Sequence, residues 1–144
     1  MDKEEIKKYG RGVWWIIHVE SVKATNKRKQ DNFIELLNTI QEEYPCVQCR
    51  IHMDQYFREN DINKYRNYEN GLGFAIYGWK FHNAVNVRLN KPLMTWEEFN
   101  NMYILKLSNC FKDCADNVEE NINVTFINNK SEKFNEKQNK FSLY

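Results

Sequence analysis

Two cysteines, at positions 46 and 49, have the types and spacing best suited to chemistry in this chain. Residues 44–49 read Tyr-Pro-Cys-Val-Gln-Cys, a C-x-x-C motif directly after a proline, in a chain with four cysteines. This spacing permits a small disulfide ring, and it also places a thiol at the start of a helix. A helix N-terminus lowers the pKa of a thiol, because its N–H groups and macrodipole favour negative charge. We therefore expect electron exchange at Cys46 and Cys49.

Two further segments carry aromatic, imidazole and amide side chains at helical spacing. One stripe comprises Trp79, His82, Asn83 and Asn86, and the other comprises Arg11, Trp14, Trp15 and His18, preceded by Gly10. Either stripe alone fits a partly buried tryptophan with a solvated or core histidine. Asparagine is disfavoured inside helices, so its repeated use beside these rings needs a reason. Two such stripes beside a C-x-x-C motif favour the walls of a site for a flat aromatic cofactor.

The elements that must position these residues are predicted to be helices. Apolar residues recur at helical period over 4–24, 30–44, 46–59 and 72–90, and in a fifth segment that begins after Thr95. Pro45 suits the first position of the third helix, and Thr95 with Glu98 forms a capping box. Gly73 and Gly78 weaken the fourth helix and indicate close approach to its backbone. The polar residues 60–70 are predicted to form a loop.

The composition of the chain limits its class. It has 144 residues, 42% of them hydrophobic, which is enough for one domain with its own core. The net charge is +1, so we expect neither nucleic acid nor a membrane as a partner. The apolar run 13–17 is too short to span a bilayer, and the charged start of the chain predicts no secretory signal. In a reducing compartment, cysteines are more often catalytic or metal-binding than structural.

The organisation of the chain changes near residue 116. We expect a helical domain over residues 1–116 and a polar tail over 117–144, rich in Asn, Lys and Glu and partly disordered. Residues 124–127 are a candidate docking strand within it. The predicted fold is all-α, a four-helix bundle with a short fifth helix.

Three blocks of residues resemble the Erv/ALR family of FAD-dependent sulfhydryl oxidases. They are Tyr9-Gly10-Arg11-x-x-Trp14-x-x-x-His18, then Tyr44-Pro45-Cys46-x-x-Cys49, then His82-Asn83-x-Val85-Asn86-x-x-Leu89-x-Lys91-Pro92. The blocks follow the family's order at similar spacing and cover residues 9 to about 110. Each block alone is weak, and the combination is specific.

The resemblance implies FAD in the mouth of the bundle and a homodimer. Cys49 would be the thiol next to the flavin, and Cys46 would be the thiol attacked by the substrate. The implied cofactor-binding residues are Gly10, Arg11, Trp14, His18, Cys49, His82, Asn83, Asn86, Lys91 and Trp96. The implied activity is thiol oxidation, which forms disulfides in partner proteins and passes electrons through FAD to O2, giving H2O2. Thiol-bearing proteins or a thioredoxin-like relay protein would be the substrates.

The chain departs from this pattern at two places. Trp79 stands near the position at which cellular relatives carry half of a further structural disulfide, so we expect that disulfide to be absent, as it is in short viral members. For a viral protein the expected location is the host cytoplasm or the virion, with the mitochondrial intermembrane space as the alternative. The second departure is Cys110 and Cys114, a C-x-x-x-C pair. Cysteines four apart in an intact helix are poorly placed to bond each other. A shuttle pair and unreactive structural thiols therefore both stay open for them.

Other functions explain less of the sequence. A zinc-binding helical module would use Cys46, Cys49, Cys110 and Cys114, with His52 as a further candidate, but it leaves the tryptophan–histidine–asparagine stripe unexplained. A thioredoxin-like enzyme requires βαβ patterning, which the sequence does not show. A non-catalytic interaction domain would not need both cysteines and the complete third block.

Overall fold

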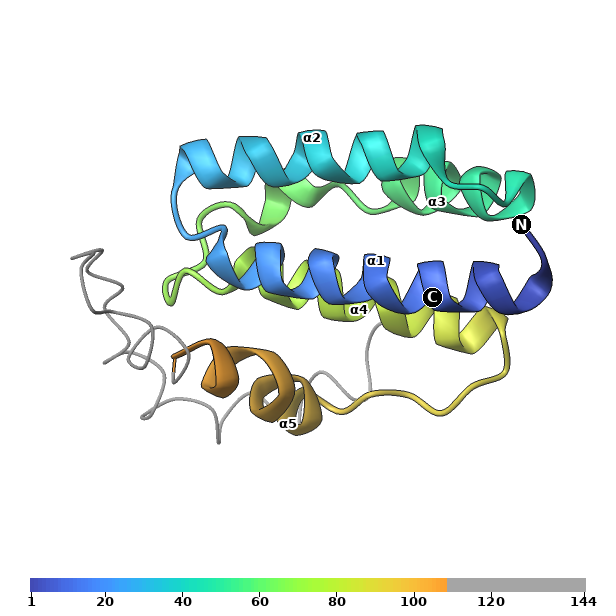
Figure 1. Ribbon diagram of the computed structural model, residues 1–144. Coiled ribbons are helices and arrows are strands. Elements are labelled where there is room, and N and C mark those ends of the chain that lie inside the picture. Colours follow the sequence, from blue (N-terminus) through green and yellow to red (C-terminus); the bar gives the residue numbers. More distant parts are fainter. Residues whose placement is uncertain (109–144) are drawn as a thin grey trace, which may run out of the picture. The chain divides into compact units, whose positions relative to one another are not determined.

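The computed structural model describes residues 1–108. It divides the chain into two compact units, Met1–Val85 and Asn86–Tyr144, and we describe each by itself. The first unit is a bundle built from α1 (Lys3–Lys23), α2 (Lys27–Glu43), α3 (Val47–Glu59) and α4 (Gly73–Arg88), the last of which continues past the division (Figure 1). A short 3-10 helix, η1 (Ile62–Tyr65), lies within the predicted loop. The described residues form helices and no strand, so the all-α prediction is confirmed.

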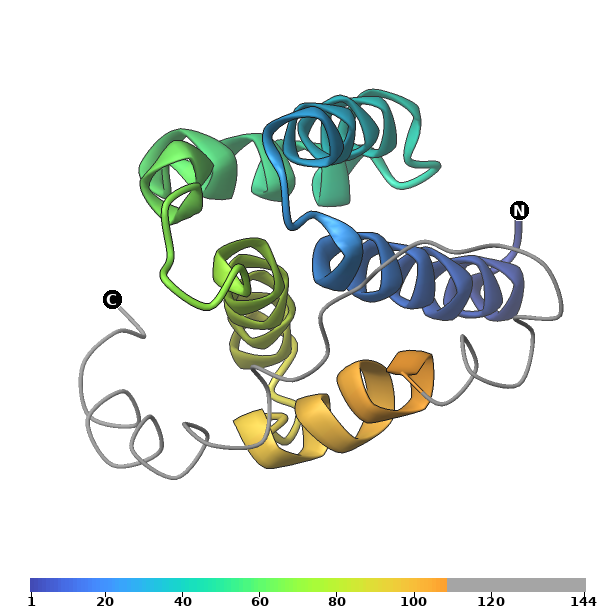
Figure 2. The same cartoon turned by 90° about the vertical axis from the view of Figure 1, so that its left-hand side faces the viewer.

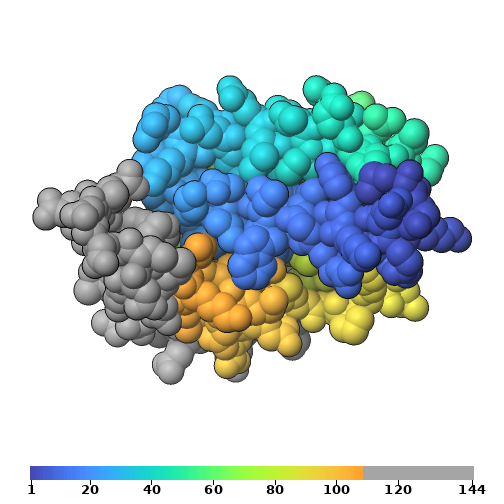
Figure 3. Space-filling view, in the orientation of Figure 1, coloured from blue at the N-terminus to red at the C-terminus, as the bar shows by residue number. Residues whose placement is uncertain are grey.

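The four helices surround one core (Figure 2). Its buried members are Ile17, Ala24, Phe33, Leu37, Met53, Phe74, Tyr77 and Phe81. Ring contacts join α2 to α4 through Phe33 and Phe74, with centroids 5.8 Å apart, and α3 to α4 through Tyr56 and Tyr77, 5.9 Å apart. α1 and α2 pack side by side and form one face of the unit (Figure 3). Burial of this aromatic surface is the main stabilising contribution.

The helix starts agree with their sequences, with one correction. Asp2 and Glu5 form a capping box at α1, and Asn26 caps α2. The sequence predicted Pro45 as the first residue of α3, and this is wrong. The helix begins at Val47, with Cys46 as its N-cap. The Cys46 sulfur accepts a hydrogen bond from a backbone N–H of the first turn, as an N-cap side chain does. The helix therefore begins after the cysteine and not at the proline.

The prediction that two glycines allow close approach to α4 is confirmed. A Cβ at Gly78 would lie 3.1 Å from Ser21 Oγ on α1, and a Cβ at Gly73 would overlap the Tyr65 carbonyl. Because neither glycine carries a side chain, α4 packs directly against α1 and η1.

The second unit contains the predicted fifth helix. α5 (Trp96–Phe99) starts with the predicted capping box of Thr95 and Glu98. It continues as a π-helix, η2 (Asn100–Ile104), which the periodicity did not indicate. The predicted domain boundary at 116, the tail 117–144, the strand at 124–127 and the Cys110/Cys114 pair lie outside the described residues. Among the residues that are described, no helix is both long enough and apolar enough to cross a membrane.

Candidate functional site: a helix-capping disulfide and a ring cluster

Cys46 and Cys49 form a disulfide at the start of α3, with their Cα atoms 5.2 Å apart. The Cys46 sulfur also caps the helix, because it accepts a hydrogen bond from the Cys49 N–H at 3.2 Å. Both residues are half-buried. When the disulfide is reduced, this N–H and the helix dipole would stabilise negative charge on the Cys46 sulfur.

Side chains of α1, α2 and α3 hold the segment that leads into the disulfide. Gln41 Nε2 donates to the Arg50 carbonyl at 3.4 Å, and Arg50 Nη1 donates to the Glu42 carbonyl at 3.0 Å. The ring of Tyr44 packs edge-on against Tyr9 of α1, with centroids 5.4 Å apart. These contacts fix the backbone around the two sulfurs, which thiol–disulfide exchange requires for a defined line of attack.

Gly10 and Tyr44 fit together at this end of the bundle. A Cβ at Gly10 would lie 2.9 Å from the Tyr44 hydroxyl oxygen, so the glycine leaves room for that group. Burial, with a smaller effect from Tyr9, raises the pKa of Tyr44, which keeps its hydroxyl neutral. The sequence places Gly10 among the cofactor-binding residues; the structure shows it in packing. Sequence reasoning did not identify Tyr44 as an anchor, although its place before Pro45 was a usable signal.

Three of the predicted cofactor-binding residues meet between α1 and α4. Trp14 stacks on His82 with centroids 4.0 Å apart and planes 6° from parallel. His18 Nε2 lies 2.7 Å from His82 Nδ1, within hydrogen-bond distance. We call Trp14, His18 and His82 the ring cluster. The structure therefore brings together residues from the first and third sequence blocks, as predicted.

The electrostatics of the ring cluster are set by His18, which is fully buried. Burial, helped by the charge of His82, lowers the pKa of His18 to about 3. His18 is therefore neutral at ordinary pH, and one ring of the pair donates the hydrogen bond that the other accepts. A Cβ at Gly78 would lie 3.8 Å from His18 Nδ1, so the glycine leaves α4 close to α1 beside this pair.

The disulfide and the ring cluster share one core. Cys49 and Trp14 both pack against the buried cluster that includes Phe81. Phe81 lies 5.0 Å from Trp14 and 5.1 Å from Phe57 of α3, measured between ring centroids. Met53 lies one turn beyond Cys49 on the same buried face of α3. Cys49 is thus the sulfur on the inward side, and the aromatic contacts run from α3 to the ring cluster.

The other predicted residues divide into two groups. In the first unit, Asn83 is buried on α4, while Arg11 and the neighbouring Trp15 are exposed on α1, so the α1 stripe is only partly inward. Asn86, Lys91 and Trp96 belong to the second unit, and their proximity to the ring cluster stays a prediction. Within that unit the Lys91 N–H donates to the Asn86 carbonyl at 2.8 Å. Asn90 has a positive φ of 52°, which ends the helix.

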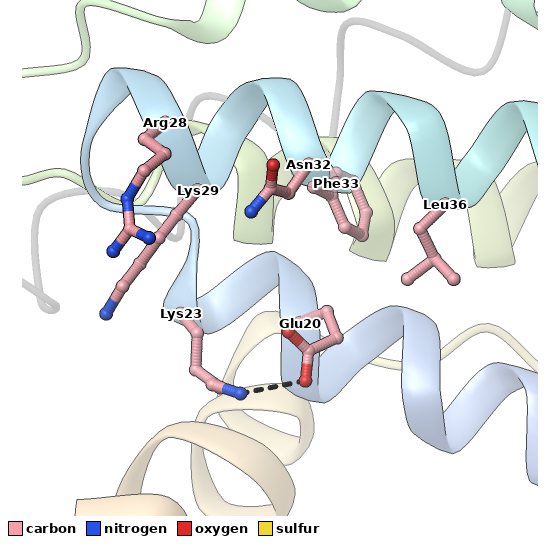
Figure 4. Close-up of a pocket in the computed structure, with 7 residues that line it drawn as sticks. All are labelled: Glu20, Lys23, Arg28, Lys29, Asn32, Phe33 and Leu36. Carbon is pink, nitrogen blue, oxygen red and sulfur yellow. Dashed lines mark hydrogen bonds and ion pairs between the residues drawn. The ribbon is translucent and has the colours of Figure 1, made fainter.

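A cavity of about 230 Å³ lies at the opposite end of α2, beside the α1–α2 connection (Figure 4). It is lined by Glu20, Lys23, Arg28, Lys29, Asn32, Phe33 and Leu36. Glu20 and Lys23 form an ion pair of 2.9 Å there. None of the predicted site residues that the structure describes lines this cavity.

The zinc alternative gains no support from residues 1–108, since no three cysteine, histidine or carboxylate side chains gather there. Cys46 and Cys49 bond each other instead, which leaves neither sulfur as a thiolate ligand.

Comparison with known proteins agrees with the geometry. The model of the Erv1/Alr family matches residues 11–104. An FAD-linked sulfhydryl oxidase of African swine fever virus (isolate Warthog/Namibia/Wart80/1980) is 31% identical over 99 residues, which are 66% of this chain and 79% of the viral protein. The FAD-linked sulfhydryl oxidase ERV1 of Oryza sativa subsp. japonica is 27% identical over 104 residues, 69% of this chain and 50% of the rice protein. The chain therefore belongs to the Erv1/Alr family.

Proposed function

We propose that this chain is an FAD-linked thiol oxidase that forms disulfides in partner proteins. The observation that carries the proposal is the Cys46–Cys49 disulfide, whose outer sulfur caps α3 while Cys49 packs on the same core as the ring cluster. The similarity to sulfhydryl oxidases of viral and plant origin supports the same conclusion.

The residues present suit a flat, polar ring system such as that of FAD. The ring cluster supplies an aromatic surface and a buried, neutral His18, which carries no charge against either redox state of a flavin. Because Trp14 and His82 stack directly on each other, no space is left between them for the flavin ring. They would therefore lie together on one side of it. When bound, FAD would take two electrons from the reduced cysteine pair and pass them to O2, giving H2O2.

We assign the binding of FAD to the residues implied by the sequence. They are Gly10, Arg11, Trp14, His18, Cys49, His82, Asn83, Asn86, Lys91 and Trp96. The ring cluster would orient the ring, and the polar residues from α4 onward would hold the ribose and phosphates. Cys49 would be the sulfur nearest the ring, because it is the cysteine on the inward face of α3.

Cys46 and Cys49 divide the exchange reaction between them. A substrate thiolate attacks the Cys46 sulfur; a substrate–Cys46 bond forms, the Cys46–Cys49 bond breaks, and Cys49 leaves as a thiolate. A second substrate thiolate then attacks the substrate sulfur of that mixed disulfide, which forms the product disulfide and releases Cys46 as a thiolate. The Cys49 N–H at the helix start stabilises this leaving thiolate.

We further expect thiol-bearing proteins or a thioredoxin-like relay protein as the electron donors, and a homodimer as the working form. The host cytoplasm or the virion is the expected location, since relatives from African swine fever virus are similar over most of their length. We also propose residues 1–116 as the oxidase domain.

The cysteine variants test the proposal. Cys49→Ser should abolish thiol-dependent O2 consumption while FAD stays bound, and Cys46→Ser should abolish it as well, because each removes the disulfide that the substrate must attack. Lys29→Gln in the remote cavity is the matched control and should keep the wild-type rate. The visible spectrum of the purified protein is measured with the rates.

Two results would contradict the assignment. One is a Cys49→Ser protein that oxidises thiols at the wild-type rate. The other is a folded wild-type protein that, after incubation with FAD and removal of the free flavin, shows no absorption band at the blue end of the visible range.

A further inference from the structure

The surface next to Cys46 carries two exposed apolar side chains. The exposed fraction of Val47 is 57% and that of Ile51 is 52%. They stand four residues apart on α3, so they are neighbours on one face of the helix. Val47 directly follows Cys46, so this apolar pair starts beside the residue whose sulfur the substrate would attack.

This apolar pair is bounded by charged residues. The next turns of the same helix face carry the ion pair of Asp54 and Arg58. The exposed carboxylates Glu42 and Glu43 end α2 on the other side of the turn. Single exposed apolar residues are ordinary on protein surfaces and indicate nothing by themselves. The position of these two, beside the one sulfur that a partner must reach, makes them informative.

The chemistry of exchange fixes where a partner's chain must lie. In a disulfide the two Cα atoms are about 6 Å apart, so a mixed disulfide with Cys46 brings the partner's cysteine that close to the start of α3. An extended chain advances about 3.3 Å per residue, so the side chains within two residues of that cysteine reach Val47 and Ile51. An apolar side chain there would remove both from water, whereas a polar side chain would gain nothing.

We propose that Val47 and Ile51 form a docking patch for apolar residues that flank the substrate cysteine. The occupant is an extended segment of a partner protein, and the preferred substrates are thiols in apolar surroundings, such as those of incompletely folded chains. The proposal rests on the proposed function, since it describes the partner in the substrate–Cys46 mixed disulfide defined there.

The test compares reduced peptides that contain the same cysteine pair, flanked in one peptide by leucine and in the other by serine. The FAD-loaded, full-length protein is assayed by O2 consumption, with dithiothreitol as a thiol without flanking residues. We expect kcat/KM for the leucine peptide to exceed that for the serine peptide by about tenfold, which corresponds to about 1.4 kcal/mol of apolar contact.

The double variant Val47→Gln/Ile51→Gln should bring this ratio close to one. Glutamine is similar in size and is favoured in helices over valine and isoleucine, so the helix is retained and the change tested is mainly one of polarity. Ile51→Leu should retain the wild-type ratio. Ile16→Gln is the matched control, because Ile16 is 48% exposed on α1 and should leave the ratio unchanged.

The outcomes separate this proposal from the proposed function. If the wild-type protein does not oxidise dithiothreitol, the proposed function fails. If it oxidises dithiothreitol but treats both peptides alike, the docking patch is wrong and the oxidase assignment stands. The docking patch is also wrong if the double variant keeps the wild-type preference for the leucine peptide. Each comparison is a ratio measured on one protein sample, so a loss of folded protein does not change it.

Discussion

The two ends of the four-helix bundle are built differently. At the right-hand end in Figure 1, the start of α1, the end of α2 and the start of α3 enclose a half-buried disulfide. Contacts from Tyr44 and Arg50 hold it, and apolar side chains remain on the surface beside it. At the left-hand end, the α1–α2 connection meets η1 and the start of α4, and charged residues line a cavity.

In the function proposed above, the chemistry lies at the disulfide end and not in this cavity. The cavity end is held by close packing of backbone: Gly73 lies against the Tyr65 carbonyl, and Gln30 Nε2 donates to the Arg66 carbonyl at 3.1 Å. At the disulfide end, Cys46 and Cys49 are only half-buried, and attack on a sulfur requires access of this kind. We therefore expect substitutions at the cavity end to affect stability, and those at the disulfide end to affect reactivity.

Gly73→Ala should give the largest loss of stability among the substitutions considered below. Its Cβ would overlap the Tyr65 carbonyl, and backbone cannot rotate away as a side chain can. We expect the free energy of unfolding to fall by about 3 kcal/mol, measured by urea denaturation. The thiol-oxidation rate per folded molecule should not change. A variant of wild-type stability would show that η1 and α4 are not held together as described.

The sequence predicted the helices well because their periodicity and caps are local signals. The bounds of α1 differ from the predicted range 4–24 by one residue at each end, and Thr95 with Glu98 caps α5 as expected. The range predicted for α3, 46–59, differs from the structure by one residue at its start, but the placement of Pro45 at the first helical position was wrong. A proline is a strong signal for a first helical position, and the capping capacity of the Cys46 sulfur outweighed it.

For the ring cluster, the sequence pattern indicated the residues but not the contacts between them. The spacing of Trp14 and His18 places them on one face of a helix, but no pattern shows that His82 stacks on the tryptophan and meets the second imidazole. Those contacts depend on how closely α1 approaches α4, and this follows from tertiary packing, of which the close contacts at Gly78 are a part. Residues beyond Val85 belong to another unit, so their part in the site rests on the sequence alone.

His18 makes the stability of the whole bundle depend on pH. Its folded-state pKa of about 3 lies below the ordinary value of 6.5, so the unfolded chain takes up a proton that the folded chain refuses. Stability is therefore complete above pH 6.5 and falls as the pH falls toward 3. Between pH 7 and pH 5 this one group should remove about 2 kcal/mol from the free energy of unfolding.

The measurement compares the wild-type protein with His18→Gln by urea denaturation at both pH values. Glutamine does not titrate, so the variant should lose about 2 kcal/mol less than the wild type over this range. His82, which faces His18 from α4, is present in both proteins. Equal losses would show that His18 is not buried as a neutral group.

Two glycines of α1 test whether Tyr44 anchors the disulfide end, and their expected effects on stability are the smallest. A Cβ at Gly12 would meet nothing within 4 Å, so Gly12→Ala should stabilise the protein by about 1 kcal/mol through helix propensity alone. Gly10→Ala gains the same propensity but must displace the Tyr44 hydroxyl that lies 2.9 Å from the added carbon. We expect it to stabilise the protein less than Gly12→Ala does. We also expect it to alter the rate of dithiothreitol oxidation, since Tyr44 leads into the disulfide. If the two variants gained equal stability and equal rates, Tyr44 would not be an anchor of the reactive end.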